Sequence, residues 1–366
     1  MKILQLFGLG DTSTLLTVGL RRLGVECDLL LSNRAFVTQY PAWTNKYPEL
    51  TEGCYTWDKS NTLDPRTLSD LYKFIRQYDL IFCHPPSGID AWNFNKPFTM
   101  WDGGSGNFIM SSKHESPMLH GRINRELARR SYKYAAYVFF NDINVIYTAW
   151  HNLSWAHDRY TYMPLPVDTS IFKPMDVPHP EQFTAYMPTR QEVHIKGIED
   201  ILHGFKMFTT HVQDAQLWIT RYGSDVPVTE YLIEKYELQN NVQWVPLVPK
   251  PQFAKLLNSA HVIIDQLRLN ALGGVADQAM ACERPVIVAI KERWYKEQIG
   301  EVPPVFNAHT AQDVCDQLLY IYDCTNYVSS SPMHSSNKSA REFILKHFEY
   351  NKVATRVYDI LQEIEQ

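Results

Sequence analysis

A loop with two cations at a fixed interval is the first place where this sequence could do chemistry. Arg190 and Lys196 stand six residues apart in MPTRQEVHIKG, and His194 lies between them. An arginine can bind two phosphate oxygens at once, and a lysine acts as a point charge. Both fit the charge that develops on a departing phosphate group. Taken alone, however, basic residues in a loop more often only face solvent.

A glycine pair at the start of a predicted helix is the second feature. The segment Asn270–Ala289 reads NALGGVADQAMACERPVIVA, and Arg284-Pro285 ends the helical pattern before an apolar run. Backbone N–H groups at a helix N-terminus have no partner within the helix and suit an anion. We therefore expect Gly273, Gly274 and Val275 to form a phosphate cradle. The alternative is a buried helix without a ligand.

The same segment resembles a known family. Its QAMACERPV, Gln278–Val286, is similar to the Glu-Ala-Met-Ala-Cys-Gly-x-Pro-Val of retaining nucleotide-sugar glycosyltransferases of family 4. The family has a Glu, seven residues and a second Glu, where this chain has Asn270 and Gln278. In the family the second Glu holds the donor ribose. Glutamine still forms hydrogen bonds but lacks the charge, and Asp277 is a candidate to compensate.

Two further matches extend this resemblance. The family places an arginine and a lysine in the corresponding loop at the spacing of Arg190 and Lys196. Pro166-Val167-Asp168 and Phe172-Lys173-Pro174 are similar to its interdomain junction. Arg268, which with Asp265-Gln266 precedes the cradle, is expected at the carboxyl end of a strand, where α/β folds bind ligands.

The resemblance implies an α/β GT-B fold with two Rossmann-like domains that face a central cleft. Residues 1–168 would form the acceptor-side domain, joined by a C-terminal helix over about residues 347–366 that crosses back. Residues 169–346 would bind the donor. It also implies transfer with retention and without a metal or other cofactor, and the family's habit favours UDP in the donor.

Two loops of the first half are candidates for the acceptor side. Gly8, Gly10 and Asp11 follow the first predicted strand, where glycines let a phosphate or sugar approach closely. This partial pattern equally fits a tight turn. The second loop, DGGSGN, contains Asp102, Gly103 and Ser105. By resemblance Asp102 stands roughly where the family has a catalytic-cleft histidine; a glycine-rich connection is the equal alternative, and His84 and His114 are further candidates.

A basic stripe is the remaining functional signal. It consists of Arg122, Arg125, Arg129, Arg130 and Lys133, which share one face of a predicted helix. Such a stripe fits an anionic partner, either nucleic acid or a membrane surface. A solvated helix face is the simpler interpretation.

Composition limits the broad class of protein. The 366 residues predict two domains, and the net charge of −5 gives no general signal for nucleic-acid binding. The six cysteines show no metal-ligand spacing, which favours a reduced compartment. No apolar run approaches the roughly 20 residues of a membrane span. We expect a cytoplasmic protein, with peripheral membrane association as an option.

Alternating strands and helices must position these residues. The strands are expected over residues 2–7, 26–31, 79–83, 97–101, 136–140, 184–187, 215–220, 242–245 and 261–265, and the main helices over 197–208, 229–236, 251–259 and 275–282, with two more after Thr310.

These observations predict a glycosyltransferase that moves a sugar from a nucleotide diphosphate sugar to a hydroxyl group. The catalytic candidates are Arg190, Lys196 and Asp102. The donor candidates are Gly8, Gly10, Asn270, Gly273, Gly274, Val275, Gln278 and Arg268, and the acceptor candidates are Asp11, Gly103, Ser105 and Arg129. Two alternatives stay open: a sugar-nucleotide epimerase and a non-catalytic nucleotide-binding relative. The acceptor can be a glycan, a lipid or a modified nucleic acid.

Overall fold

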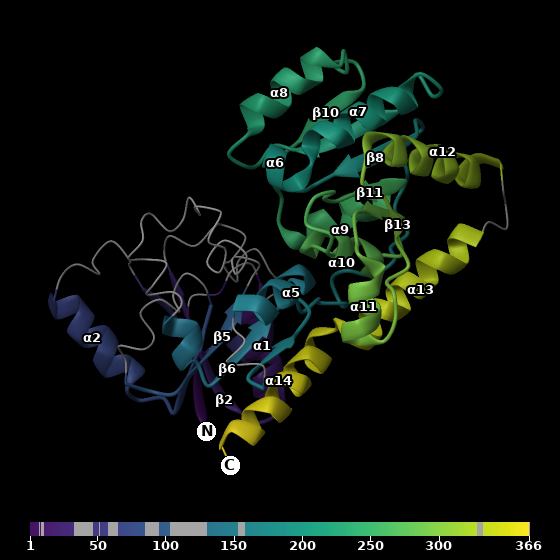
Figure 1. Cartoon of the computed structure of the whole chain (residues 1–366). Coiled ribbons are helices and arrows are strands. Elements are labelled where there is room, and N and C mark those ends of the chain that lie inside the picture. Colours follow the sequence, from purple (N-terminus) through teal and green to yellow (C-terminus); the bar gives the residue numbers. More distant parts are fainter. Residues whose placement is uncertain are drawn as a thin grey trace. The chain divides into compact units, whose positions relative to one another are not determined.

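The computed structural model describes residues 1–6, 8, 11–32, 47–50, 52–57, 65–84, 95–102, 130–152, 158–327 and 332–365. The chain forms two compact units, drawn in Figure 1. The first comprises Met1–Pro166 with Glu349–Gln366, and the second comprises Val167–Phe348. The change of unit falls in the proline-rich segment Tyr162–Pro174. Proline blocks regular strand pairing and favours such connections.

The first unit is built on a seven-stranded parallel sheet in the order β3-β2-β1-β4-β5-β6-β7. Strands β1, β4 and β5 are buried almost throughout, as expected for strands with both faces covered. The elements are β1 Lys2–Leu6, α1 Thr12–Arg22, β2 Glu26–Ser32, β3 Cys54–Trp57, α2 Pro65–Ile75, β4 Leu80–Cys83, β5 Phe98–Asp102, β6 Tyr137–Phe140, α5 Ile143–Asn152 and β7 Tyr160–Tyr162, with a short 3₁₀ helix at Pro48–Leu50.

The last helix, α14 (Tyr350–Glu365), belongs to this first unit and packs against α1 (Figure 1). Its apolar residues Val353, Val357 and Leu361 join the core of the first sheet. A glycine makes the close approach possible, because a Cβ on Gly19 would lie 2.4 Å from that of Ala354.

The second unit has a six-stranded parallel sheet in the order β10-β9-β8-β11-β12-β13. Its elements are β8 Thr184–Met187, α6 Val193–Lys196, α7 Ile198–Thr209, β9 Gln216–Thr220, α8 Val226–Lys235, β10 Val242–Val245, α9 Lys250–Ser259, β11 Val262–Ile264, α10 Gly274–Ala281, β12 Val286–Val288, α11 Glu292–Ile299, β13 Phe306–Asn307, α12 Ala311–Tyr327 and α13 Pro332–His347. Helix α7 packs against α12, and α10 packs against α13.

Two parallel sheets with flanking helices confirm the predicted α/β class with two Rossmann-like domains. The expected strands of the second half match the observed ones to within two residues. The prediction of two closing helices was wrong, because α12, α13 and α14 follow Thr310. The short strands β3 and β7 were not predicted, since three or four residues carry little periodicity. Within the described ranges, no helix is long and apolar enough to cross a bilayer.

Candidate functional site

The candidate site lies where the second sheet reverses its strand order. Strand β8 pairs with β9 on one side and with β11 on the other, so the chain winds outward in both directions from the β8/β11 pair. In such sheets, ligands bind beyond the carboxyl ends of the strands at this switch point. The basic loop follows β8, and the glycine-containing segment follows β11.

Lys196 is fixed to the end of β11 through its backbone. The N–H of Leu267 donates a 3.0 Å hydrogen bond to the carbonyl oxygen of Lys196. The next residue, Gly197, has φ of +72° and ends the short helix α6. A side chain there would be strained, and its Cβ would lie 3.1 Å from that of Leu267. Gly197 thus allows the basic loop to pack against the segment that leads to α10.

Arg190 has a different environment. Its side chain is exposed, and its Nη2 lies 3.2 Å from Oε2 of Glu192. Its positive charge also lowers the pKa of Tyr222, although burial has the larger effect and raises it. Arg190 is thus paired within its own loop, whereas Lys196 is bound through its backbone to the end of β11.

Asp265 connects the strand end to the first turn of α10. It is 1% exposed, and its Oδ2 accepts a 3.3 Å hydrogen bond from the N–H of Ala276. A Cβ on Gly273 would lie only 2.7 Å from the same oxygen, so the Asp265 carboxyl group itself requires this glycine. Burial raises the pKa of Asp265, while the charge of Lys196 and hydrogen bonds from Ala276, Gly273 and Thr189 lower it. Asp265 therefore connects the end of β11 to the helix start, and the charge of Lys196 acts on its carboxyl group.

Asp277 belongs to the first turn of α10 and is buried near Asp265. It is 1% exposed, and its Oδ1 has no hydrogen-bond partner among the described residues. Burial, followed by the charge of Asp265, raises the pKa of Asp277 well above its ordinary value. A buried carboxyl group next to another carboxyl group is not free to compensate for Gln278 at a ribose.

The loop before α10 is braced on several sides. Asn270 adopts a left-handed conformation with φ of +55°. The side chain of Gln266 accepts a hydrogen bond from the N–H of Leu269 and donates one to the carbonyl oxygen of Ala271. The N–H of Leu272 donates to the hydroxyl oxygen of Tyr295 at 2.6 Å. Asn270 is thus presented on an ordered loop.

Two other donor candidates have defined surroundings. Gln278 is half-buried on α10, one turn beyond the glycine pair. Arg268 forms an ion pair with Asp200 of α7, which gives its guanidinium a partner within the unit. The sequence interpretation missed the bracing residues Thr189, Gln266 (in its bracing role) and Tyr295. Thr189 and Gln266 had a readable signal, because each is a polar residue two positions beyond the end of a buried strand.

The candidate site residues of the first unit lie at or just beyond the carboxyl ends of strands β1 and β5. Gly8 follows β1, and a Cβ there would overlap the side chain of Ser13 in α1. Asp11 is the residue before α1 and is 9% exposed. Asp102 ends β5, but its carboxyl group is fully buried and accepts a 2.5 Å hydrogen bond from the hydroxyl group of Tyr132. This geometry suits a positioning role, so direct contact of Asp102 with a sugar stays a prediction.

His84 follows β4 and is also enclosed. It is 1% exposed and its Nε2 lies 2.7 Å from Oε1 of Gln5. Burial lowers the pKa of His84 to about 3. His84 is therefore neutral and packed within the first unit, and its role in a cleft stays a prediction.

Several predicted residues lie outside the described part of the chain. They are Gly10, Gly103, Ser105, His114, Arg122, Arg125 and Arg129.

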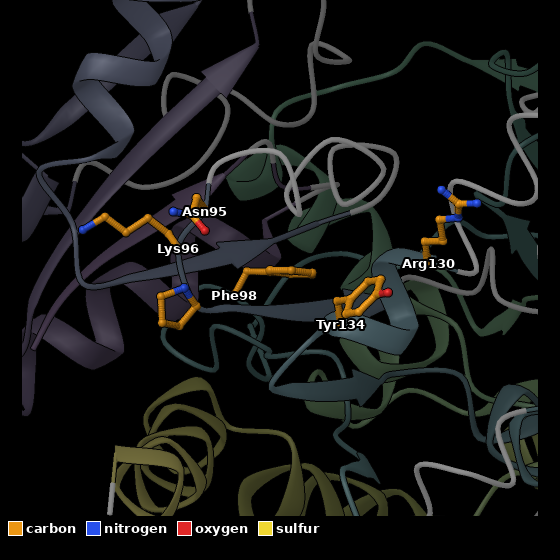
Figure 2. Close-up of a pocket in the computed structure, with 6 residues that line it drawn as sticks. Asn95, Lys96, Phe98, Arg130 and Tyr134 are labelled. Atoms are coloured by element: carbon orange, nitrogen blue, oxygen red, sulfur yellow. The ribbon is translucent and has the colours of Figure 1, made fainter.

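The described end of the basic stripe contains Arg130 and Lys133. Arg130 helps to line a cavity of about 460 Å³, together with Asn95, Lys96, Pro97, Phe98 and Tyr134 (Figure 2). Phe98 begins β5 and Asp102 ends it, so this cavity lies at the amino ends of the strands and Asp102 lies at their carboxyl ends. In Figure 2 the charged ends of Lys96 and Arg130 lie on opposite sides of Phe98 and Tyr134. The cavity therefore does not concentrate its two cations on one point.

Solved structures of other proteins share this architecture. The chain superimposes over 100% of its length on 99% of sucrose-phosphate synthase from Thermosynechococcus elongatus, with a TM-score of 0.73 and 16% identity. It matches Anabaena HepE in complex with UDP and glucose with a TM-score of 0.69 and 13% identity, over 99% and 100% of the two chains. The fold is GT-B. The GT-B fold is shared by a putative UDP-N-acetylglucosamine 2-epimerase from Listeria monocytogenes, with a TM-score of 0.58, 14% identity, and 99% and 96% coverage.

The second unit also matches at the level of sequence. Residues 171–319 fit the family model of glycosyl transferases group 1. No curated protein matches the sequence. The matched residues include the basic loop, Asp265 and α10. Together with the GT-B fold, this match supports nucleotide-sugar-dependent glycosyl transfer.

Proposed function

We propose that this GT-B protein transfers a sugar with retention from a UDP-sugar to a hydroxyl acceptor, without a metal. The observation that carries the proposal is that the end of β11 binds both the basic loop, through Leu267 and Lys196, and the first turn of α10, through Asp265, at the switch point of the matched unit. A diphosphate needs cations and N–H donors at one place. The UDP found in complexes of Anabaena HepE is consistent with this donor class.

The reaction exchanges one bond for another. The bond between the anomeric carbon and the diphosphate oxygen breaks, and a bond to the acceptor hydroxyl oxygen forms. The acceptor proton passes to the leaving phosphate oxygen, so no protein base is needed. Lys196 and Arg190 would stabilise the negative charge on the diphosphate, and Gln278 and Asn270 would hydrogen-bond the nucleotide and sugar.

A ligand screen followed by a transfer assay tests the proposal. Thermal unfolding of the full chain would be recorded with UDP, GDP, ADP and their sugars, and we expect the largest rise in Tm with a UDP-sugar. Donor turnover would then be measured with glycan, lipid and nucleic-acid acceptors, including anionic ones that could use the Arg122–Lys133 stripe. Absence of any nucleotide-dependent shift would overturn the proposal.

Two other functions give different outcomes in the same assays. An epimerase would change the sugar of its donor without an acceptor, so product analysis of donor alone distinguishes it. The replacement of the family's acidic pair by Asn270 and Gln278 favours, as a second candidate, a binding protein that holds nucleotide without turnover. Calorimetric binding of UDP with no product from any donor would support that candidate.

A further inference from the structure

The first turn of α10 divides its backbone donors into two groups. Asp265 receives the N–H groups of Gly273 and Ala276. For the N–H groups of Gly274 and Val275, the described part of the chain provides no hydrogen-bond acceptor. Both residues are half-buried rather than enclosed. The carboxyl group of Asp265 thus binds part of the first turn of α10, and the backbone N–H groups of Gly274 and Val275 remain without an acceptor in the described part of the chain.

Asp265 also faces the basic loop. Burial raises the pKa of Asp265, while the charge of Lys196 and the side chain of Thr189, which is 3% exposed, lower it. Two residues beyond Asp265, Leu267 holds the carbonyl oxygen of Lys196 at 3.0 Å. The strand end Asp265–Leu267 therefore binds the helix start through the carboxyl group of Asp265 and the basic loop through the N–H of Leu267.

We propose that Asp265 is a positioning residue, which holds Lys196 and the first turn of α10 in place and leaves the N–H groups of Gly274 and Val275 for an anionic group of the donor. The inference rests on the proposed function and assigns a role to a residue that does not itself touch the donor. It acts through two groups that do. A buried acceptor of several hydrogen bonds is costly to remove, which makes the role measurable.

Asp277 provides a matched control. It is as buried as Asp265 and lies beside it, but its raised pKa favours the neutral form, and Oδ1 has no described partner. An amide closely replaces a neutral carboxyl group. Asp277→Asn should therefore bind UDP as the wild type does, whereas Asp265→Asn can place an NH₂ group against the N–H donor of Ala276.

A double-mutant cycle tests the proposal with UDP as the probe. Calorimetry would compare wild type, Asp265→Asn, Lys196→Ala and the double variant, with thermal unfolding as the check of folding. We expect Asp265→Asn to weaken UDP binding by about tenfold or more. In the Lys196→Ala background the same change should cost about threefold or less, because residues that act through one another are not additive.

The outcomes separate this inference from the proposed function. Unchanged or tighter UDP binding by Asp265→Asn, or an equal loss in both backgrounds, would overturn the positioning role while the proposed function stands. A wild type that binds no nucleotide diphosphate would overturn the proposed function itself. If Asp265→Asn does not fold, Thr189→Val removes one donor to the same carboxyl group and should weaken UDP binding by a smaller factor; wild-type affinity there contradicts the inference.

Discussion

The hydroxyl oxygen of Tyr295 accepts a 2.6 Å hydrogen bond from the N–H of Leu272, and Tyr295 is only 1% exposed. This contact links α11 to the loop that carries Asn270 into α10. The same loop is held from its other end by Gln266. The shape of the candidate donor site therefore depends on a residue that lies outside it.

Tyr295→Phe should destabilise the second unit by about 1–3 kcal/mol, because the buried N–H of Leu272 loses its acceptor. UDP binding should weaken with it, since the loop is less well held. Urea denaturation and calorimetry measure the two effects. Tyr231→Phe, at a side chain that is exposed on α8, is the control and should change neither. Equal stability of both variants would contradict the bracing role.

Lys196→Ala and Arg190→Ala should each lower the rate of sugar transfer by roughly 100-fold or more, by analogy with the loss of one group that stabilises charge in a transition state. Steady-state kinetics with a UDP-sugar provide the measurement. Arg293→Ala is a suitable control, because that side chain is 85% exposed and forms an ion pair with Glu297 one turn further along α11. Wild-type turnover in both cation variants would count against the proposed site.

Gly19→Ala should destabilise the first unit by about 1–3 kcal/mol through overpacking of α1 against α14. The added Cβ would lie 2.4 Å from that of Ala354, which is too close for two carbon atoms. The change Ala354→Gly in the same chain should restore much of the loss. Urea denaturation of the single and double variants tests this, and failure of the second change to compensate would place the strain elsewhere.

Stability should fall as the pH is lowered from about 6.5, the pKa of an unperturbed histidine. Burial lowers the pKa of His84 to about 3 and that of His261 to about 4, so the unfolded chain binds protons at a pH where the folded chain does not. Each group contributes up to about 1.4 kcal/mol per pH unit between its two pKa values. This stability is fully present above the unfolded pKa and is lost toward the folded one.

The pH effect can be assigned to one residue by substitution. His84→Asn should reduce the slope of unfolding free energy against pH between about pH 6.5 and 4. His211→Asn, at an exposed position, should leave the slope unchanged. Denaturant titrations at several pH values give the comparison. An identical slope in wild type and His84→Asn would show that this histidine is not held neutral by the fold.

The sequence alone was sufficient for the class of fold and for the elements that flank the proposed donor site. Strands such as Thr184–Met187 are short apolar runs bounded by loops, and α7 has apolar residues at helical spacing, so local patterns identify both. Gly273-Gly274 marked the start of α10, and the prolines after Tyr162 marked the change of unit. These features depend on neighbouring residues, which a sequence displays directly.

Only the tertiary structure showed what those residues contact. Gly273 was predicted to admit a phosphate, but its Cα faces Asp265, a residue eight positions earlier that pairing of β11 with β8 brings beside the basic loop. The hydrogen bond from Tyr132 to the buried carboxyl group of Asp102 was likewise not readable from the sequence, and the role of Asp102 at a sugar stays a prediction. The roles of Tyr295 and Thr189 likewise depend on contacts between distant segments. Burial and hydrogen-bond partners are properties of packing across the sheet, and no local spacing encodes them.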